Sequence, residues 1–217
     1  MRQCLDGKPD TISIKPVDLR KKLFKRPGKT LIVFVVDASD SMGQGTFARM
    51  KAAKGAALAI LTKAHLERHR VAMVAFRDES AAVILQPTAS RVLAQKNLKE
   101  LPTGGATPFA HGLMKAWRIV NTERLKDPEI RPLLVIISDG EANVSYGPNL
   151  SPTKVMDELF VICRKIGQDN IYSIAIDTKP IMNKTDDMRR IAESLGGTYH
   201  HVHHLRARNV VEFISKF

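Results

Sequence analysis

A run of six apolar residues at positions 31–36 constrains the fold of this chain more than any other stretch. Its sequence is Leu-Ile-Val-Phe-Val-Val, mostly β-branched, and it stops abruptly at Asp37. A short, continuous apolar run of this kind is typical of a strand buried on both faces, as strands of a parallel sheet are. We therefore expect a central strand of a parallel sheet here.

Small side chains that carry oxygen follow this strand at alternate positions. They are Asp37, Ser39 and Ser41, and Gly43 comes soon after them. In a loop at the end of a strand, side chains with this spacing can converge on one point, and a hard cation takes oxygen ligands. The pattern predicts a cation site. The alternative interpretation is a serine-rich turn after a core strand.

Two further segments have features that complement this strand end. Residues 132–138 form a second apolar run, which ends in Asp139, and the turn-prone loop 104–108 carries the hydroxyl of Thr107. In an open α/β sheet, ligands bind outside the carboxyl ends of the strands, where the strand order reverses. We expect the strands that end at Asp37 and Asp139 to be neighbours there. The alternative for Asp139 and Gly140 is an ordinary turn.

The ordered set Asp-x-Ser-x-Ser, then Thr, then Ser-Asp-Gly resembles the metal-ion-dependent adhesion site (MIDAS) of von Willebrand factor A domains. The resemblance extends from about Thr30 over most of the chain. It implies that Mg²⁺ or Mn²⁺ binds at five residues, which are Asp37, Ser39, Ser41, Thr107 and Asp139. Two carboxylates balance a divalent charge, and Mg²⁺ keeps a position open for an outside ligand. In the family, that ligand is an acidic side chain supplied in trans.

The remaining elements predict a doubly wound α/β fold. It has a mostly parallel six-stranded sheet, helices on both faces and one antiparallel edge strand, as in Rossmann-like folds. The expected strands are 31–36, 71–76, 82–85, 132–138, 170–176 and 198–202. The expected helices are 46–65, 90–99, 108–125, 151–166, 186–195 and one from about 206. Thr46 and Thr107 are the expected N-caps of two of them.

The charge is unevenly distributed. The formal net charge is +12, and residues 1–30 hold nine Lys and Arg against three Asp. We expect residues 1–29 to form a basic arm or linker and residues 30–217 to form the von Willebrand factor A domain. Only Phe24 interleaves with the basic residues of the arm, so a base-stacking surface is not indicated and nucleic acid is not the expected partner.

Targeting signals and cysteine usage favour a cytoplasmic protein. No apolar run approaches the ~20 residues that span a bilayer, and the first residues lack the apolar core of a secretory signal. Cys4 and Cys163 are the only cysteines, too few for a disulfide scaffold. We expect free thiols and no membrane association.

No catalytic constellation is evident, and we expect no active site in this chain itself. A phosphate-binding GxxxxGK[ST] loop is absent, and Ser39 stands where a haloacid dehalogenase-type phosphatase has its second acid. His111 is expected to be structural or exposed.

Four histidines near the last expected strand form a cluster. The cluster suits either a zinc, cobalt or nickel site or, as the favoured alternative, a polar strand end. Its members are His200, His201, His203 and His204.

Several longer motifs look like the C-terminal domain of the magnesium chelatase D subunit. They include Phe34-Val-Val-Asp-Ala-Ser-Asp-Ser-Met42, Leu101-Pro-Thr-Gly-Gly-Ala-Thr-Pro108 and Ser138-Asp-Gly-Glu-Ala-Asn143. This resemblance implies a non-catalytic subunit or domain of an ATP-dependent tetrapyrrole metal chelatase that inserts magnesium or cobalt. It also implies docking to an AAA+ ATPase subunit, and to the large catalytic subunit, through a metal-bridged acid.

The sequence departs from that family in two ways. The AAA+-like half that precedes the domain in the D subunit is not in this sequence, which predicts either a stand-alone protein or a fragment. Asp40 stands where the family usually has Gly, and its carboxylate either competes for the open metal position or points to solvent. The alternative functions are a metal-dependent adaptor for a different, MoxR-like AAA+ machine and an RNA-binding protein of the same fold.

Overall fold

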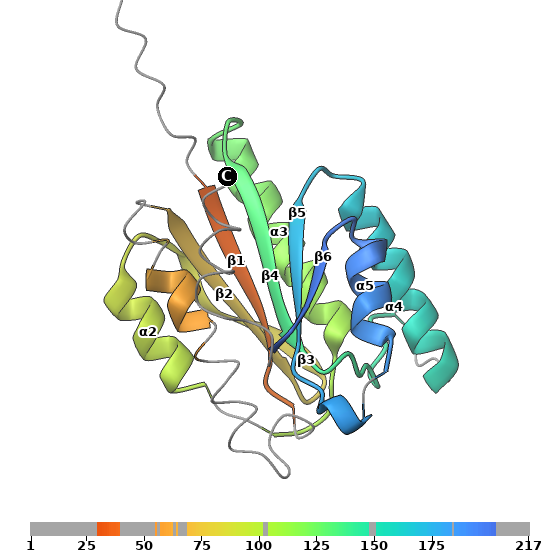
Figure 1. Ribbon diagram of the computed structural model, residues 1–217. Helices are drawn as coiled ribbons and strands as arrows, with labels where there is room; N and C mark the ends of the chain where they lie inside the picture. The colour runs from red at the N-terminus through yellow and green to blue at the C-terminus, as the bar shows by residue number, and fades with distance from the viewer. Residues whose placement is uncertain are drawn as a thin grey trace, which may run out of the picture.

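The computed structural model describes residues 30–39, 55, 57–62, 64, 69–101, 104–147, 151–183 and 185–202. Six strands form one sheet in the order β3-β2-β1-β4-β5-β6 (Figure 1). The strands are β1 Thr30–Asp37, β2 Arg70–Arg77, β3 Ser80–Thr88, β4 Arg131–Ser138, β5 Tyr172–Asp177 and β6 Thr198–His201. The helices with described bounds are α2 Arg91–Lys99, α3 Phe109–Lys126, α4 Pro152–Gly167, α5 Asp187–Ser194 and the 3-10 helix η3 Ile181–Asn183.

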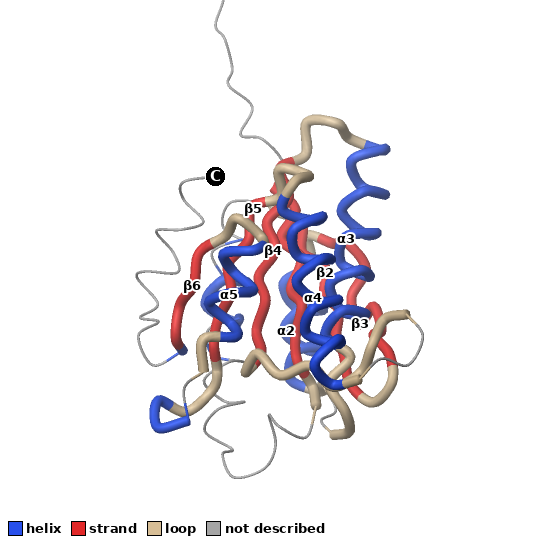
Figure 2. The backbone as a smooth tube through the Cα atoms, turned by 90° about the vertical axis from the view of Figure 1, so that its right-hand side faces the viewer, coloured by secondary structure: helices blue, strands red, loops and turns tan. Residues whose placement is uncertain are grey.

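The sheet is doubly wound, as predicted. Only the β2–β3 pair is antiparallel, so β3 is the expected antiparallel edge strand. Helix α2 packs on β2 and β3, and α5 packs on β5 and β6, while α4 lies between α3 and α5 (Figures 1 and 2). Of the described helices, none is long and apolar enough to cross a membrane.

Strand β1 shows why its apolar run had to be continuous. Leu31, Val33 and Val35 pack in a core cluster with residues of α3, α4 and α5. Ile32 and Phe34 pack on the opposite face, in a cluster with α2 and with helical residues between 57 and 64. Because successive side chains of a strand point to opposite faces, a strand covered on both sides needs an apolar residue at every position.

Helix α3 approaches the sheet closely near its N-terminus. A Cβ added at Gly112 would lie 2.5 Å from Cδ1 of Phe76, so only glycine allows this spacing. The ring of Phe76 stacks on Phe109 with centroids 5.0 Å apart. These contacts hold the start of α3, and the loop before it, against the carboxyl end of β2.

Three predicted details were wrong. Strand β3 covers Ser80–Thr88 rather than 82–85. Thr107 is not the N-cap of α3, because the helix begins one residue later and Pro108 occupies the cap without a side-chain bond. Strand β5 begins at Tyr172 rather than at 170, since Asn170 has a φ of 52° and belongs to the preceding turn. The predicted N-cap Thr46 and the terminal helix from 206 lie outside the described residues.

Candidate functional site

The carboxyl ends of β1 and β4 lie side by side at the centre of the sheet. The two strands are parallel neighbours, with Val36 paired to Ile137, so Asp37 and Ser138 come next on each strand. The chain proceeds from β1 toward β2 on one side and from β4 toward β5 on the other. This is the point where strand order reverses, and the neighbour relation expected for these two strands is confirmed.

Hydrogen bonds from Ser39 and Ser138 orient the carboxylate of Asp37. Its Oδ1 accepts a bond from the backbone N–H of Ser39 at 2.9 Å, and its Oδ2 accepts one from the hydroxyl of Ser138 at 2.7 Å. Both Asp37 and Ser39 are fully buried. The side chain of Ser39 also hydrogen-bonds this carboxylate. A carboxylate has about four lone-pair sites, so it retains capacity for a further ligand.

The pKa of Asp37 is raised from 3.8 to about 7, and burial is the largest cause. Hydrogen bonds from Ser39 and Ser138 act in the opposite direction, whereas the negative charge of Asp139 raises the pKa further. The two buried carboxylates therefore repel each other when both are ionised. A cation between them would remove that penalty, because an opposite charge within a few ångströms favours the ionised form.

A tight turn places Asp139 at this edge. Its Oδ1 accepts a hydrogen bond from the N–H of Glu141 at 3.1 Å, and its side chain is buried. Gly140 has a φ of 85°, and a Cβ there would lie 2.9 Å from Cγ of Met188. A side chain at this position would meet both backbone strain and a close contact with α5, so the turn after Asp139 requires glycine.

The loop that carries Thr107 is fastened at both ends. The N–H of Gly104 donates to the carbonyl of Ala38 at 2.8 Å, which ties the loop to the end of β1. The N–H of Thr107 donates to Oδ1 of Asn143 at 2.6 Å, and the N–H of Asn143 donates to the carbonyl of Thr107 at 3.2 Å. Thr107 is buried where the segments after β1 and β4 meet.

The chain is similar to known proteins both in sequence and in structure. The family model described as the von Willebrand factor type A domain matches residues 32–141. The chain belongs to this family. Its sheet also superposes on the von Willebrand factor domain of the type V pili tip protein Mfa5 from Porphyromonas gingivalis. That comparison has a TM-score of 0.65, 13% identity and coverage of 87% of this chain and 95% of the other.

Two relatives in sequence are informative. The chain is 34% identical to a magnesium-chelatase 67 kDa subunit of Chlorobaculum tepidum, over 90% of this chain and 32% of that subunit. It is 36% identical to an uncharacterized protein of Methanocaldococcus jannaschii, over 77% of this chain and 94% of that protein. The chain spans about a third of the length of the magnesium-chelatase subunits it matches.

Four of the five predicted site residues of this von Willebrand factor type A domain are described, and they share one edge of the sheet. Asp37, Ser39, Thr107 and Asp139 are all buried there, while Ser41 lies outside the described residues. Two carboxylates and neutral hydroxyls are a donor set of the all-oxygen type that Mg²⁺ accepts. In the described part of the chain, no group of three or more His, Cys, Asp or Glu side chains could hold a metal ion. The predicted set would not form such a group, because Asp37 and Asp139 are its only carboxylates and its other members are hydroxyl residues.

Sequence reasoning assigned no role to Ser138 or Asn143. Ser138 hydrogen-bonds Asp37, 101 positions away, and Asn143 holds the backbone of Thr107. Both stand in the Ser-Asp-Gly-Glu-Ala-Asn motif, which was the available signal. Their partners are distant in sequence, so the motif alone did not reveal what each residue contacts.

The histidines considered in the sequence are described only in part. Nε2 of His201 lies 2.7 Å from the carbonyl of Lys179, and burial lowers the pKa of the neighbouring His200. His203 and His204 lie outside the described residues. On α3, the ring of His111 contacts Tyr146 with centroids 4.9 Å apart, and burial lowers its pKa.

Proposed function

We propose that this domain binds Mg²⁺ or Mn²⁺ through Asp37, Ser39, Ser41, Thr107 and Asp139, and that the bound cation docks an acidic side chain of a partner protein. One observation carries the proposal. Two buried carboxylates from neighbouring strand ends lie close enough for the charge of Asp139 to raise the pKa of Asp37. Such a pair is costly to ionise unless a cation lies beside it.

The residues of the chain have distinct roles in this proposal. Ser138 and the N–H of Ser39 hold the Asp37 carboxylate in one orientation. Asn143 holds the backbone of Thr107, so the hydroxyl comes from a fixed loop. The cation, when bound, supplies a coordination position that an outside carboxylate can fill. Because the protein ligands include only two charges, a third carboxylate remains an attractive ligand.

Similarity to magnesium-chelatase subunits supports a place in a tetrapyrrole metal chelatase that inserts magnesium or cobalt. In this proposal the domain is non-catalytic and acts in the cytoplasm. Its partner is the AAA+ ATPase subunit, with the large catalytic subunit as a further contact. The second candidate is an adaptor for a different, MoxR-like AAA+ machine, which would use the same metal-bridged docking.

Calorimetry tests the metal site. Mg²⁺ and Mn²⁺ titrated into the metal-free chain should bind, and Asp37→Ala should abolish this binding because it removes one of two charged ligands. Asp157→Ala is the matched control, since it removes an exposed carboxylate on α4. Equal binding by the wild type and Asp37→Ala contradicts the assignment.

Association assays test the docking step. Binding to a chelatase ATPase subunit should weaken when EDTA is added, and also in Thr107→Ala and Asp139→Ala. Asp40→Gly should leave association intact or strengthen it, because it removes a possible competing acid. If neither EDTA nor the two alanine substitutions changes association, the docking mechanism is wrong even where calorimetry detects a metal.

A further inference from the structure

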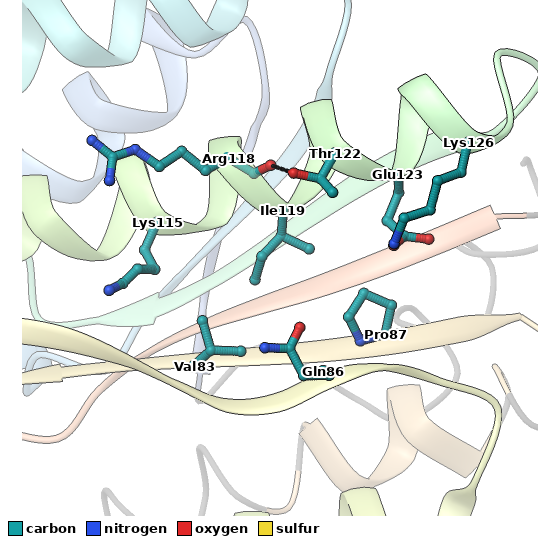
Figure 3. A pocket seen from close by; sticks show the side chains of 9 residues that line it. All are labelled: Val83, Gln86, Pro87, Lys115, Arg118, Ile119, Thr122, Glu123 and Lys126. Atoms are coloured by element: carbon teal, nitrogen blue, oxygen red, sulfur yellow. Dashed lines mark hydrogen bonds and ion pairs between the residues drawn. The ribbon is translucent and has the colours of Figure 1, made fainter.

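A groove with a basic lining lies between α3 and the edge strand β3, and its lining includes none of the proposed metal ligands. Its volume is about 170 Å³. Figure 3 shows α3 as one wall and β3 as the other, with Ile119 pointing between them. Lys115 points toward β3 at one end of the groove and Lys126 lies at the other, whereas the guanidinium of Arg118 lies on the side of α3 away from β3 (Figure 3). Lys115 is six residues beyond Phe109, the first residue of α3, which corresponds to roughly 9 Å along the helix axis.

Positive charge is in excess along this groove. Glu123, the one acidic residue in the lining, is buried and forms ion pairs with Arg70 and Lys126. Burial acts to raise the pKa of Glu123, but the bonds from Lys126 and Arg70 hold it below its usual value. Within the described residues, Lys115 and Arg118 have no ion pair, and Arg118 donates to the neutral hydroxyl of Tyr146.

The shape of the groove favours an extended segment over a compact ligand. Small-molecule sites enclose roughly 300–1,000 Å³, and this groove is smaller. Lys115 and Lys126 are eleven residues apart on α3, roughly 16 Å along the helix, which an extended chain spans in about five residues. Side chains two residues apart in such a chain point to the same side, so alternate acids can reach both ends.

The apolar floor of the groove suits the stems of such side chains. Ile119 from α3 and Val83 and Pro87 from β3 line its middle. Gln86 adds an amide that can donate to a backbone carbonyl of the occupant. The lining therefore combines apolar contact with cations at both ends.

We propose that the groove between α3 and β3 binds an extended acidic segment of a partner protein. Charge argues against a segment of this chain as the occupant. The three long stretches outside the described residues, 1–29, 40–54 and 203–217, each carry more Lys and Arg than Asp and Glu. This interaction needs no metal, and it can form while the edge around Asp37 contacts another surface.

Fluorescence anisotropy with a labelled hexaglutamate peptide and the full chain tests the proposal. The charge-reversal variant Lys115→Glu/Arg118→Glu should bind the peptide at least tenfold more weakly than the wild type. The matched control is Lys96→Glu/Lys154→Glu, which changes net charge equally at exposed positions on α2 and α4 and should lose twofold or less. Thr122→Trp obstructs the groove without changing charge, so it should also weaken binding. This variant provides the test if the double variant does not fold.

Three results would overturn the proposal. Equal losses in the groove and control variants would mean that only net charge attracts the peptide. Displacement of the peptide by inorganic triphosphate at equal total charge would make the groove a small-anion site. Tighter binding of a single-stranded oligonucleotide, lost in the same groove variant, would make it a nucleic-acid surface. Each measurement uses EDTA-treated protein, so a failure here is separate from a failure of the proposed metal site.

Discussion

Asp37→Asn in the metal-free chain isolates the cost of burying the Asp37 charge. The folded pKa of about 7 lies above the unfolded value of 3.8, so the folded state holds this proton more tightly. The stability that this proton contributes is complete below pH 3.8 and is lost as pH rises through 7. A difference of about three pH units, at about 1.4 kcal/mol each, corresponds to roughly 4 kcal/mol.

The measurement is urea denaturation in EDTA at pH 5 and pH 8. About 3 kcal/mol of the loss falls in this interval, because the group is mostly protonated at pH 5 and ionised at pH 8. Asn keeps the shape of the protonated side chain without a charge, so Asp37→Asn should not show this loss. Saturating Mg²⁺ at pH 8 should stabilise the wild type and leave the variant unchanged, since a ligand stabilises only the state that binds it.

Asp157→Asn controls for the removal of any carboxylate, because Asp157 is exposed on α4. It should follow the wild-type pH dependence. If the wild type and Asp37→Asn lose the same free energy of unfolding between pH 5 and pH 8, burial does not penalise the Asp37 charge, and the electrostatic argument for a cation fails.

Three further predictions concern packing and support of the site. Gly112→Ala should lower the free energy of unfolding by about 1–3 kcal/mol in urea denaturation, since its Cβ would lie 2.5 Å from a core ring. Gly55→Ala, a helical position with nothing within 4 Å, should instead be neutral or stabilising. Glu123→Gln should cost about 2–3 kcal/mol in the same assay, because two cations lose their buried partner; unchanged stability would contradict the ion-pair geometry. Asn143→Ala should weaken Mg²⁺ binding about tenfold in calorimetry by releasing the backbone of Thr107, and wild-type affinity would show that this clamp is not needed.

Much of the fold was predictable because its signals are local. The run at 31–36 marked a strand buried on both faces, and the short polar turn after Arg77 marked the antiparallel edge strand. Boundaries were less predictable. Thr107 has the side chain of an N-cap, but the first helical bond runs from the N–H of Gly112 to the carbonyl of Pro108, so the helix begins after Pro108. Periodicity does not report at which residue the first helical bond forms.

The sequence by itself indicated the candidate metal ligands, because they stand at strand ends and in a loop before a helix: Asp37, Ser39, Ser41, Thr107 and Asp139. Only the tertiary structure decided that β1 and β4 are neighbours and that Ser138 bonds Asp37 across 101 residues. It also decided that Arg70 pairs with Glu123 beside the groove. The physical reason is that spacing along the chain reports the local backbone, whereas strand order and buried polar partners depend on how distant segments pack together.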